Sequence, residues 1–202
     1  MKAVIMSVQP EWVQKIIARK KSFEIRKTKP NLPTPFKVYV YCTYGEGLIE
    51  AYDEINPNAL IGIKVNRNET WGNCCNGKVV CEFICDAIVV DKTFGHDPLL
   101  YTAACMDAAD IAAYCVNAEM YGWHISDLKI YDKPKELREF TRYGDEDIRP
   151  CQKNPYFLCQ HEYYDYSEDC NACNIDFDGT ACPYIKVNRP PQSWCYVEEL
   201  EN

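Results

Sequence analysis

The chain has 202 residues, enough for one domain with a full hydrophobic core. Apolar residues make up 47% and charged residues 26%, which is ordinary for a globular protein in water. The formal net charge of −8 argues against a general duplex-DNA-binding protein, which needs a broad basic face. No apolar run approaches the roughly 20 residues of a membrane span, and the run 3–6 is too short for the core of a signal peptide. We therefore expect a cytoplasmic protein without membrane contact.

Charge is distributed unevenly along the chain. Residues 1–37 carry nine Lys and Arg against two acidic residues, a local charge of +7, and the remaining 165 residues carry −15. A basic site on an acidic body favours a small or short anionic ligand over a long polyanion. The alternative is a solvated basic face that binds nothing.

The N-terminal part predicts a strand, a helix and a second strand. Segment 2–8 alternates as a strand does, and Pro10 suits the first position of a helix. The apolar stripe of that helix consists of Val13, Ile16 and Ile17. In the following strand, 22–27, the period of two places Glu24 and Arg26 on one face and Phe23 and Ile25 on the other.

The rest of the chain predicts a strongly curved β structure of the α+β class. The further expected elements are a strand at 36–43, a short strand at 60–65, a long strand at 78–90, a helix at 107–116, a strand at 123–131 that Pro134 ends, a helical turn at 135–140 and a strand at 194–200. An apolar run as long as 78–90 is expected to bend, as strands in small barrels do.

Four stretches, in this order, resemble the ASCH domain family, whose β-barrel is related to PUA domains. They are 6–12 (MSVQPEW), 21–27 (KSFEIRK), 123–128 (WHISDL) and 189–197 (RPPQSWCYV). The family motif Gly-x-Lys-x-x-Glu-x-Arg maps onto Arg19, Lys21, Glu24 and Arg26. Arg19 replaces the family's glycine, which suits the left-handed residue after a helix end. Either the helix ends differently here, or strain is tolerated to place another cation at the site.

The resemblance implies one small PUA-like mixed β-barrel over 1–202, with short flanking helices and a Cys-rich insertion at 141–188. It also implies binding of RNA or of a modified nucleoside or nucleotide in a basic cleft lined by the motif. Some members resemble amidohydrolases that act on an acylated cytidine, and ribonuclease activity is a further possibility that the family raises. The enzymatic alternative is thus an amidohydrolase or a ribonuclease.

The candidate ligand-binding residues are Arg19, Lys21, Glu24, Arg26, Trp123 and His124. In an enzyme, Lys21 would be the base or nucleophile and Glu24 the proton carrier. These residues also have structural interpretations. Lys21 can be a solvated surface lysine, Glu24 and Arg26 can form an ion pair that stiffens the sheet, and His124 can be a core or rim residue. Trp123, like Trp12 and Trp194, can stack on an unpaired base or fill the core.

Thirteen cysteines are a high number, and a reducing cytosol argues against a disulfide framework. Five lie within apolar patterns and are expected to be core thiols: Cys42, Cys81, Cys85, Cys105 and Cys115. The others concentrate in the acidic, Tyr-rich segment 141–188, which has no sustained hydrophobic period and reads as an insertion.

The insertion carries a candidate metal site. Cys170 and Cys173 form a C-x₂-C pair, which can hold one metal ion from a tight turn. Cys159 and Cys182 could complete a tetrahedral set, with Cys151 or His161 as alternates. We expect structural zinc, with an iron–sulfur cluster or a loop with free thiols as the alternatives. The acidic insertion could also dock a protein partner.

Overall fold

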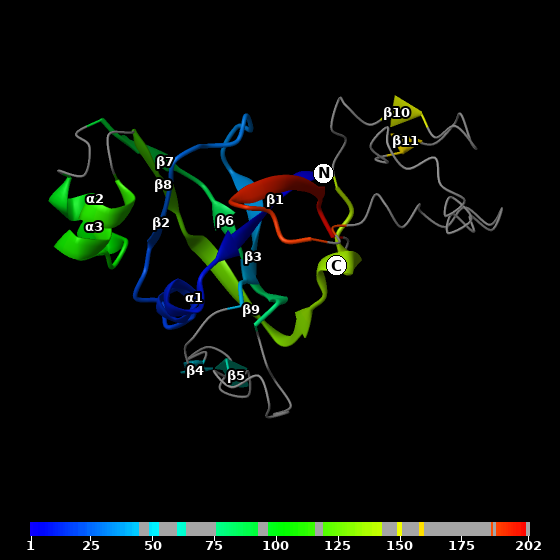
Figure 1. The fold of residues 1–202 in the computed structure, drawn as a ribbon, viewed down its shortest axis with the longest axis horizontal. Helices are drawn as coiled ribbons and strands as arrows, with labels where there is room; N and C mark the ends of the chain where they lie inside the picture. The colour runs from blue at the N-terminus through cyan, green and yellow to red at the C-terminus, as the bar shows by residue number, and fades with distance from the viewer. Residues whose placement is uncertain are drawn as a thin grey trace.

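The computed structural model describes residues 1–44, 49–52, 60–63, 76–92, 97–115, 119–142, 149–150, 158–159, 187 and 189–200. Of these, the backbone alone is described for 49–52, 60–63, 149–150 and 158–159. Mixed sheets with short flanking helices make up this part of the chain, so the fold is α+β as predicted (Figure 1).

The larger sheet has five strands in the order β12-β1-β3-β6-β9. Their bounds are β1 Lys2–Val8, β3 Phe36–Cys42, β6 Lys78–Cys85, β9 Ser126–Lys135 and β12 Trp194–Glu198. Strand β1 runs parallel to β3, and the other neighbours are antiparallel. Both faces of β1 are covered, because Val4 and Met6 pack in one apolar cluster and Ala3 and Ile5 in another. A strand buried on both faces reads as a continuous apolar run, as β1 does.

The smaller sheet has three strands in the order β2-β8-β7, with bounds β2 Phe23–Arg26, β7 Ile88–Asp91 and β8 Met120–His124. Two further pairs are β4 Ile49–Tyr52 with β5 Leu60–Ile63, and β10 Arg149–Pro150 with β11 Leu158–Cys159. The helices are α1 Pro10–Ile17, α2 Pro98–Ala103, α3 Ala108–Tyr114 and the 3₁₀ turn η1 Leu137–Glu139.

Two backbone segments run through both sheets. The predicted strand 78–90 bends as expected, because it leaves the larger sheet at Cys85 and enters the smaller one at Ile88. The chain returns through Ile125, which separates β8 from β9. Pairs Ile84–Ser126 and Ile88–Trp123 lie on the two sides of this bend.

Two details of the prediction need correction. Pro134 lies inside β9 and does not end it, which an edge strand tolerates because one side of its backbone needs no partner. The described strands also do not close into a barrel, since β12 and β9 form opposite edges of the larger sheet. The core between the sheets is closed by side chains instead, among them Trp123, Phe83 and the α1 stripe.

The residues before and after segment 143–186 lie side by side next to the larger sheet. Phe140 and Val187 are fully buried, and the Val187 amide donates a 2.9 Å hydrogen bond to the Phe140 carbonyl. Arg142 forms a bridge with Val197 in β12. No helix in the described ranges is long and apolar enough to cross a membrane.

Candidate functional site

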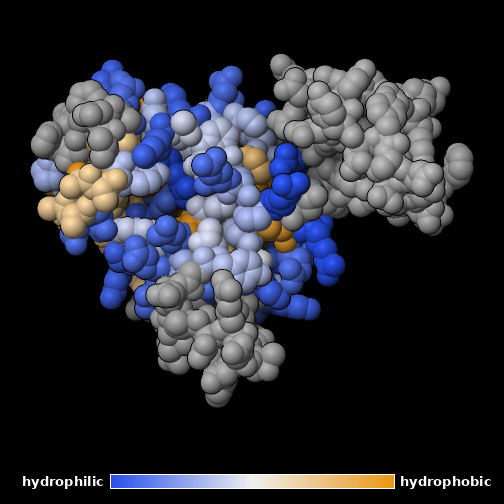
Figure 2. Space-filling model, viewed as in Figure 1, coloured by the Kyte–Doolittle hydropathy of each residue, from blue (hydrophilic) through white to orange (hydrophobic). Residues whose placement is uncertain are grey.

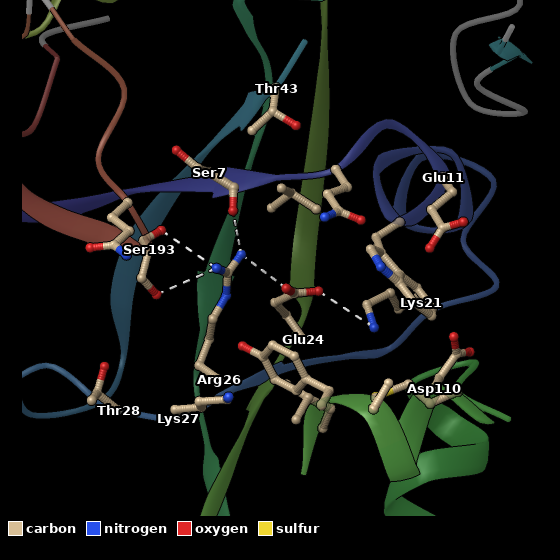
Figure 3. Close-up of a pocket in the computed structure, with 18 residues that line it drawn as sticks. Ser7, Glu11, Lys21, Glu24, Arg26, Lys27, Thr28, Thr43, Asp110 and Ser193 are labelled. Atoms are coloured by element: carbon tan, nitrogen blue, oxygen red, sulfur yellow. Dashed lines mark hydrogen bonds and ion pairs between the residues drawn. The ribbon is translucent and has the colours of Figure 1, made fainter. Parts of the chain in front are cut away.

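A pocket of about 690 Å³ opens between the two sheets and helices α1 and α3 (Figure 3). Its lining comes from the end of β1, the first turn of α1, strand β2 with the residues after it, helix α3 and the segment before β12. In the space-filling view, hydrophobic side chains gather at the α2–α3 end, and smaller hydrophobic areas lie near the middle of a mostly hydrophilic face (Figure 2). Pockets of this volume suit small molecules.

The basic turn before β2 is built by the end of α1. The amides of Arg19 and Lys20 donate 2.9 Å hydrogen bonds to the carbonyls of Ile16 and Lys15, which is the Schellman pattern of a helix C-terminus. Arg19 has φ 55°, the left-handed conformation that glycine adopts freely. The helix therefore ends as the glycine motif would end it, and the chain tolerates the strain of a side chain there.

This turn docks onto the C-terminal end of α2. The ammonium of Lys21 donates a 2.7 Å hydrogen bond to the carbonyl of Ala104, and the Ser22 amide donates one of 2.9 Å to Ala103. Lys15 reaches the carbonyl of Cys105 at 3.2 Å. Carbonyls at a helix end lack partners within the helix, so these donors satisfy them.

Lys21, Glu24 and Arg26 form a continuous row at the floor of the pocket (Figure 3). One carboxylate oxygen of Glu24 lies 3.0 Å from an Arg26 terminal nitrogen, and the other lies 3.4 Å from Nζ of Lys21. All three side chains are more than nine-tenths buried. The period of two in β2 thus places Glu24 and Arg26 on the pocket side, while Ile25 packs in the apolar cluster behind it.

Arg26 ties this row to β1 and to the segment before β12. It donates a 2.7 Å hydrogen bond to the Ser7 carbonyl and longer ones of 3.5 Å to the carbonyl and hydroxyl oxygens of Ser193. Its Nε is buried and forms no hydrogen bond within the described residues, and the buried Oε2 of Glu24 has the 3.4 Å ion pair with Lys21 but no closer donor there. The floor therefore keeps hydrogen-bonding capacity that its own side chains do not use.

Burial lowers the pKa of Lys21 from its ordinary value of 10.5, and the adjacent Glu24 carboxylate opposes this shift. The ammonium is also 4.7 Å from the centre of the Trp12 ring. Lys21 is thus surrounded by a carbonyl, a carboxylate and an aromatic face, which all favour its charged form, against desolvation, which disfavours it.

Among the described residues that line the pocket, positive and negative charges balance, so this lining does not form the predicted basic cleft. The described lining residues include three cations and three carboxylates, namely Lys21, Arg26, Lys27, Glu11, Glu24 and Asp110. The local charge of +7 in residues 1–37 is spread over several surfaces, and Arg19, Lys20 and Lys29 are exposed outside the lining. A balanced lining suits a polar ligand of low net charge better than a polyanion.

The described lining includes two aromatic residues, Trp12 from α1 and Tyr114 from α3. Burial raises the pKa of the Tyr114 phenol, the nearby Arg26 lowers it, and Glu24 raises it. The phenol therefore lies close enough to the charged row to interact with it. Aromatic faces beside hydrogen-bonding groups are typical of sites that hold flat heterocyclic rings.

The remaining predicted ligand-binding residues lie outside the pocket lining. Arg19 is exposed and donates a 3.3 Å hydrogen bond to the Leu128 carbonyl. Trp123 is fully buried between Phe36 and Trp194, with ring centres 5.6 and 5.9 Å away. His124 lies at the surface with its Nδ1 2.6 Å from Oδ1 of Asp86. The structure thus brings Lys21, Glu24 and Arg26 together and places these three elsewhere.

Sequence reasoning missed several lining residues. Tyr114 and Asp110 lie in the predicted helix 107–116, and Ser193 lies in the stretch 189–197, but nothing in either pattern points to the N-terminal motif. The sequence does contain a signal for the start of α3, because Asp107 and Asp110 have the spacing of a capping box. In the structure Asp107 caps the helix and exchanges hydrogen bonds with Asp110.

The predicted metal ligands cannot be placed. Cys151, His161, Cys170, Cys173 and Cys182 lie outside the described residues, and Cys159 is described only as backbone in β11. Among the described residues, no group of three or more His, Cys, Asp and Glu side chains could hold a metal ion. The zinc or iron–sulfur site therefore stays a prediction.

The predicted core thiols can be checked directly. Cys42, Cys81, Cys85 and Cys115 are buried, as expected. Cys105 is free but only half-buried, because it follows the end of α2 with φ 55° and its Sγ faces the Lys20 carbonyl at 3.0 Å.

No family model matches the chain. No curated protein matches it either. The structure is similar to solved ASCH structures from Zymomonas mobilis. One, a point mutant, is 15% identical, with 77% of this chain and 86% of that chain covered and a TM-score of 0.40. A second point mutant is 13% identical over 98% of this chain and 89% of that chain, with a TM-score of 0.42.

A third ASCH structure from Zymomonas mobilis is 14% identical over 75% of this chain and 80% of that chain, with a TM-score of 0.40. All three carry the name of the family that the sequence resembles. The identities and TM-scores are too low to carry an argument about this chain, so its site is judged on its own geometry.

Proposed function

We propose that the pocket binds a modified nucleoside or nucleotide, free or as part of an RNA. The observation that carries this proposal is the Lys21–Glu24–Arg26 row beneath a pocket that Trp12 and Tyr114 also line. A nucleobase has a flat face that stacks on aromatic rings and an edge with both donors and acceptors. The ASCH resemblance of the sequence points to the same ligand class.

The equal numbers of positive and negative charges in the described lining limit which ligands can bind. A long RNA held through its phosphates needs a broad positive surface, and the lining has as many carboxylates as cations. A single nucleotide, or one unpaired nucleotide of an RNA, needs only a polar pocket with local charges. We therefore place the base and sugar inside the pocket and any further RNA outside it.

Binding can be tested by calorimetry on the purified chain with a panel of nucleosides, 5′-nucleotides and short RNAs, including modified bases. We expect at least one nucleoside or nucleotide to bind, and Glu24→Gln to weaken its binding about tenfold or more by removing the buried charge that orders the row. Glu198→Gln, an exposed carboxylate on β12, is the matched control and should bind as the parent does.

Circular dichroism of both variants separates a lost fold from a lost site. If no nucleoside, nucleotide or RNA binds to folded protein, or if Glu24→Gln and Glu198→Gln weaken binding equally, the proposal fails.

A second candidate function is hydrolysis, and the observation that favours it is the burial of Lys21 beside Glu24, because burial lowers the pKa of the lysine. A lysine that loses its proton more easily can act as a base toward water, with Glu24 beside it to carry the proton. The substrate would be an acylated cytidine, cleaved with one water to cytidine and a carboxylic acid, or an RNA phosphodiester. Chromatography of the panel after incubation tests this, and Lys21→Met should abolish any conversion.

A further inference from the structure

The two ends of the pocket differ in charge. Figure 3 places Lys27, Thr28 and Ser193 on the Arg26 side of Glu24. Glu11 and Asp110 lie on the opposite side, beyond Lys21. The charges of the described lining residues therefore sum to zero but are separated in space, with a cationic end at Arg26 and Lys27 and an acidic end at Glu11 and Asp110. A ligand with an anionic group should enter with that group toward Arg26.

Hydrogen-bond donors at the cationic end are left over by the protein's own contacts. Thr28 accepts a 3.0 Å hydrogen bond from the Trp194 indole, so its own hydroxyl proton remains available. The Ser193 hydroxyl likewise accepts a hydrogen bond, from Arg26 at 3.5 Å, so its proton is also available to donate. Both hydroxyls can therefore donate to an anion next to the guanidinium.

The cations at this end are also available. Lys27 is exposed and sits 4.9 Å from the centre of the Tyr114 ring, and it forms no ion pair with a carboxylate in the part of the chain that the structure describes. Within the described residues, the second terminal nitrogen of Arg26 makes two long contacts, both with Ser193 at 3.5 Å. A phosphate oxygen would replace these long contacts with shorter, charge-assisted ones.

From this arrangement we propose an anion subsite formed by Arg26, Lys27, Thr28 and Ser193 that takes the phosphate ester of the ligand. The inference deepens the proposed function and rests on it for the placement of the base. It assigns the ligand class as a phosphorylated nucleoside, with the base toward α1 and α3. The phosphate comes either from a 5′-monophosphate or from a phosphodiester of RNA.

The test is calorimetry with matched pairs of compounds at low salt: each nucleoside against its 5′-monophosphate and its dinucleotide, and ribose against ribose 5-phosphate. We expect the phosphorylated member to bind about tenfold more tightly, and less so as salt screens the contact. Lys27→Gln should reduce the preference to about threefold or less. Lys29→Gln, an exposed lysine outside the lining that removes the same charge, should preserve it.

The outcomes separate the two proposals. Nucleosides that bind as tightly as their monophosphates overturn the anion subsite and leave the nucleoside pocket standing. Binding of ribose 5-phosphate that depends on Lys27, with no nucleoside bound, supports the subsite and overturns the nucleoside pocket. If Lys27→Gln and Lys29→Gln reduce the preference equally, the effect is one of overall charge and the subsite is wrong. A dinucleotide that binds more tightly than the monophosphate identifies RNA as the source.

Discussion

Arg19 and Cys105 occupy equivalent places in the structure: each is the first residue after the C-cap of a helix, and each has φ 55°. Both helix ends close with the same pair of hydrogen bonds. The two ends also face each other, because Cys105 Sγ lies 3.0 Å from the Lys20 carbonyl. Lys21, the first residue of the pocket floor, therefore follows a contact between the C-terminal ends of α1 and α2, each of which carries a residue in the left-handed conformation.

Glycine at position 19 should give a more stable protein than alanine at the same position. Glycine adopts the left-handed conformation without steric cost, although it gains entropy in the unfolded chain. We expect Arg19→Gly to unfold with a free energy about 1 kcal/mol above that of Arg19→Ala, measured by urea denaturation. Arg19→Ala keeps the strain and removes the exposed guanidinium. Equal stability of the two variants would show that the backbone here carries no strain.

Replacing Lys21 with methionine should destabilise the fold. The change removes the hydrogen bond to Ala104 and leaves Glu24 with Arg26 alone. We expect a loss of about 3 kcal/mol in urea unfolding, the lower end for a broken buried pair, because Arg26 still neutralises the carboxylate. Lys20→Met changes an exposed neighbour and should stay within about 0.5 kcal/mol of the parent. A similar small effect for both variants would contradict the buried row.

The stability that depends on Lys21 should rise with pH. Burial lowers the pKa of Lys21 in the folded protein, so the unfolded chain holds this proton more tightly. The cost of burying the charge is fully present below the folded pKa and disappears as the pH rises toward the unfolded value of 10.5. We expect the difference in unfolding free energy between the parent and Lys21→Met to grow as the pH rises from neutral toward 10.5, the unfolded value. Because the tyrosines titrate in both proteins, the difference isolates Lys21, and a flat or falling difference would disprove the shift.

Adding a methyl group at Gly122 should disturb the smaller sheet. Gly122 pairs with Ile25 and Val89 in the central strand, and a Cβ there would lie 2.5 Å from Cδ1 of Leu100. Since Leu100 is buried, Gly122→Ala should cost about 1–3 kcal/mol in thermal or urea unfolding. The same change made in a Leu100→Ala background should cost almost nothing further. A full cost in that background would place the clash elsewhere.

Local patterns predicted the elements that position the site. The proline at the start of α1, its apolar stripe and the alternation in β2 each depend on residues a few positions apart, and all three are confirmed. The bend after Cys85 also followed from the length of one apolar run. These signals are local, so a single sequence contains them.

The opposite wall of the pocket depends on contacts between distant segments. Helix α2 was not predicted, because it has only six residues and Leu99 within it is 82% exposed, which leaves no apolar period to detect. Without α2 there was no partner for Lys21, whose contact with Ala104 spans 83 positions. Trp123 and Trp12 looked equivalent in the sequence, and only packing separates the buried one from the one at the pocket.

The hydrogen bond between Val187 and Phe140 has a practical consequence for how the chain can be divided. The two flanks of segment 143–186 are already fastened to each other in the core, so the sheet does not depend on the intervening residues to bring them together. A chain in which a short glycine-rich bridge joins Arg142 to Val187 should retain the pocket above Lys21, Glu24 and Arg26. Such a miniature would allow the two functions suggested for this protein, ligand capture and metal or partner binding, to be assayed in separate molecules.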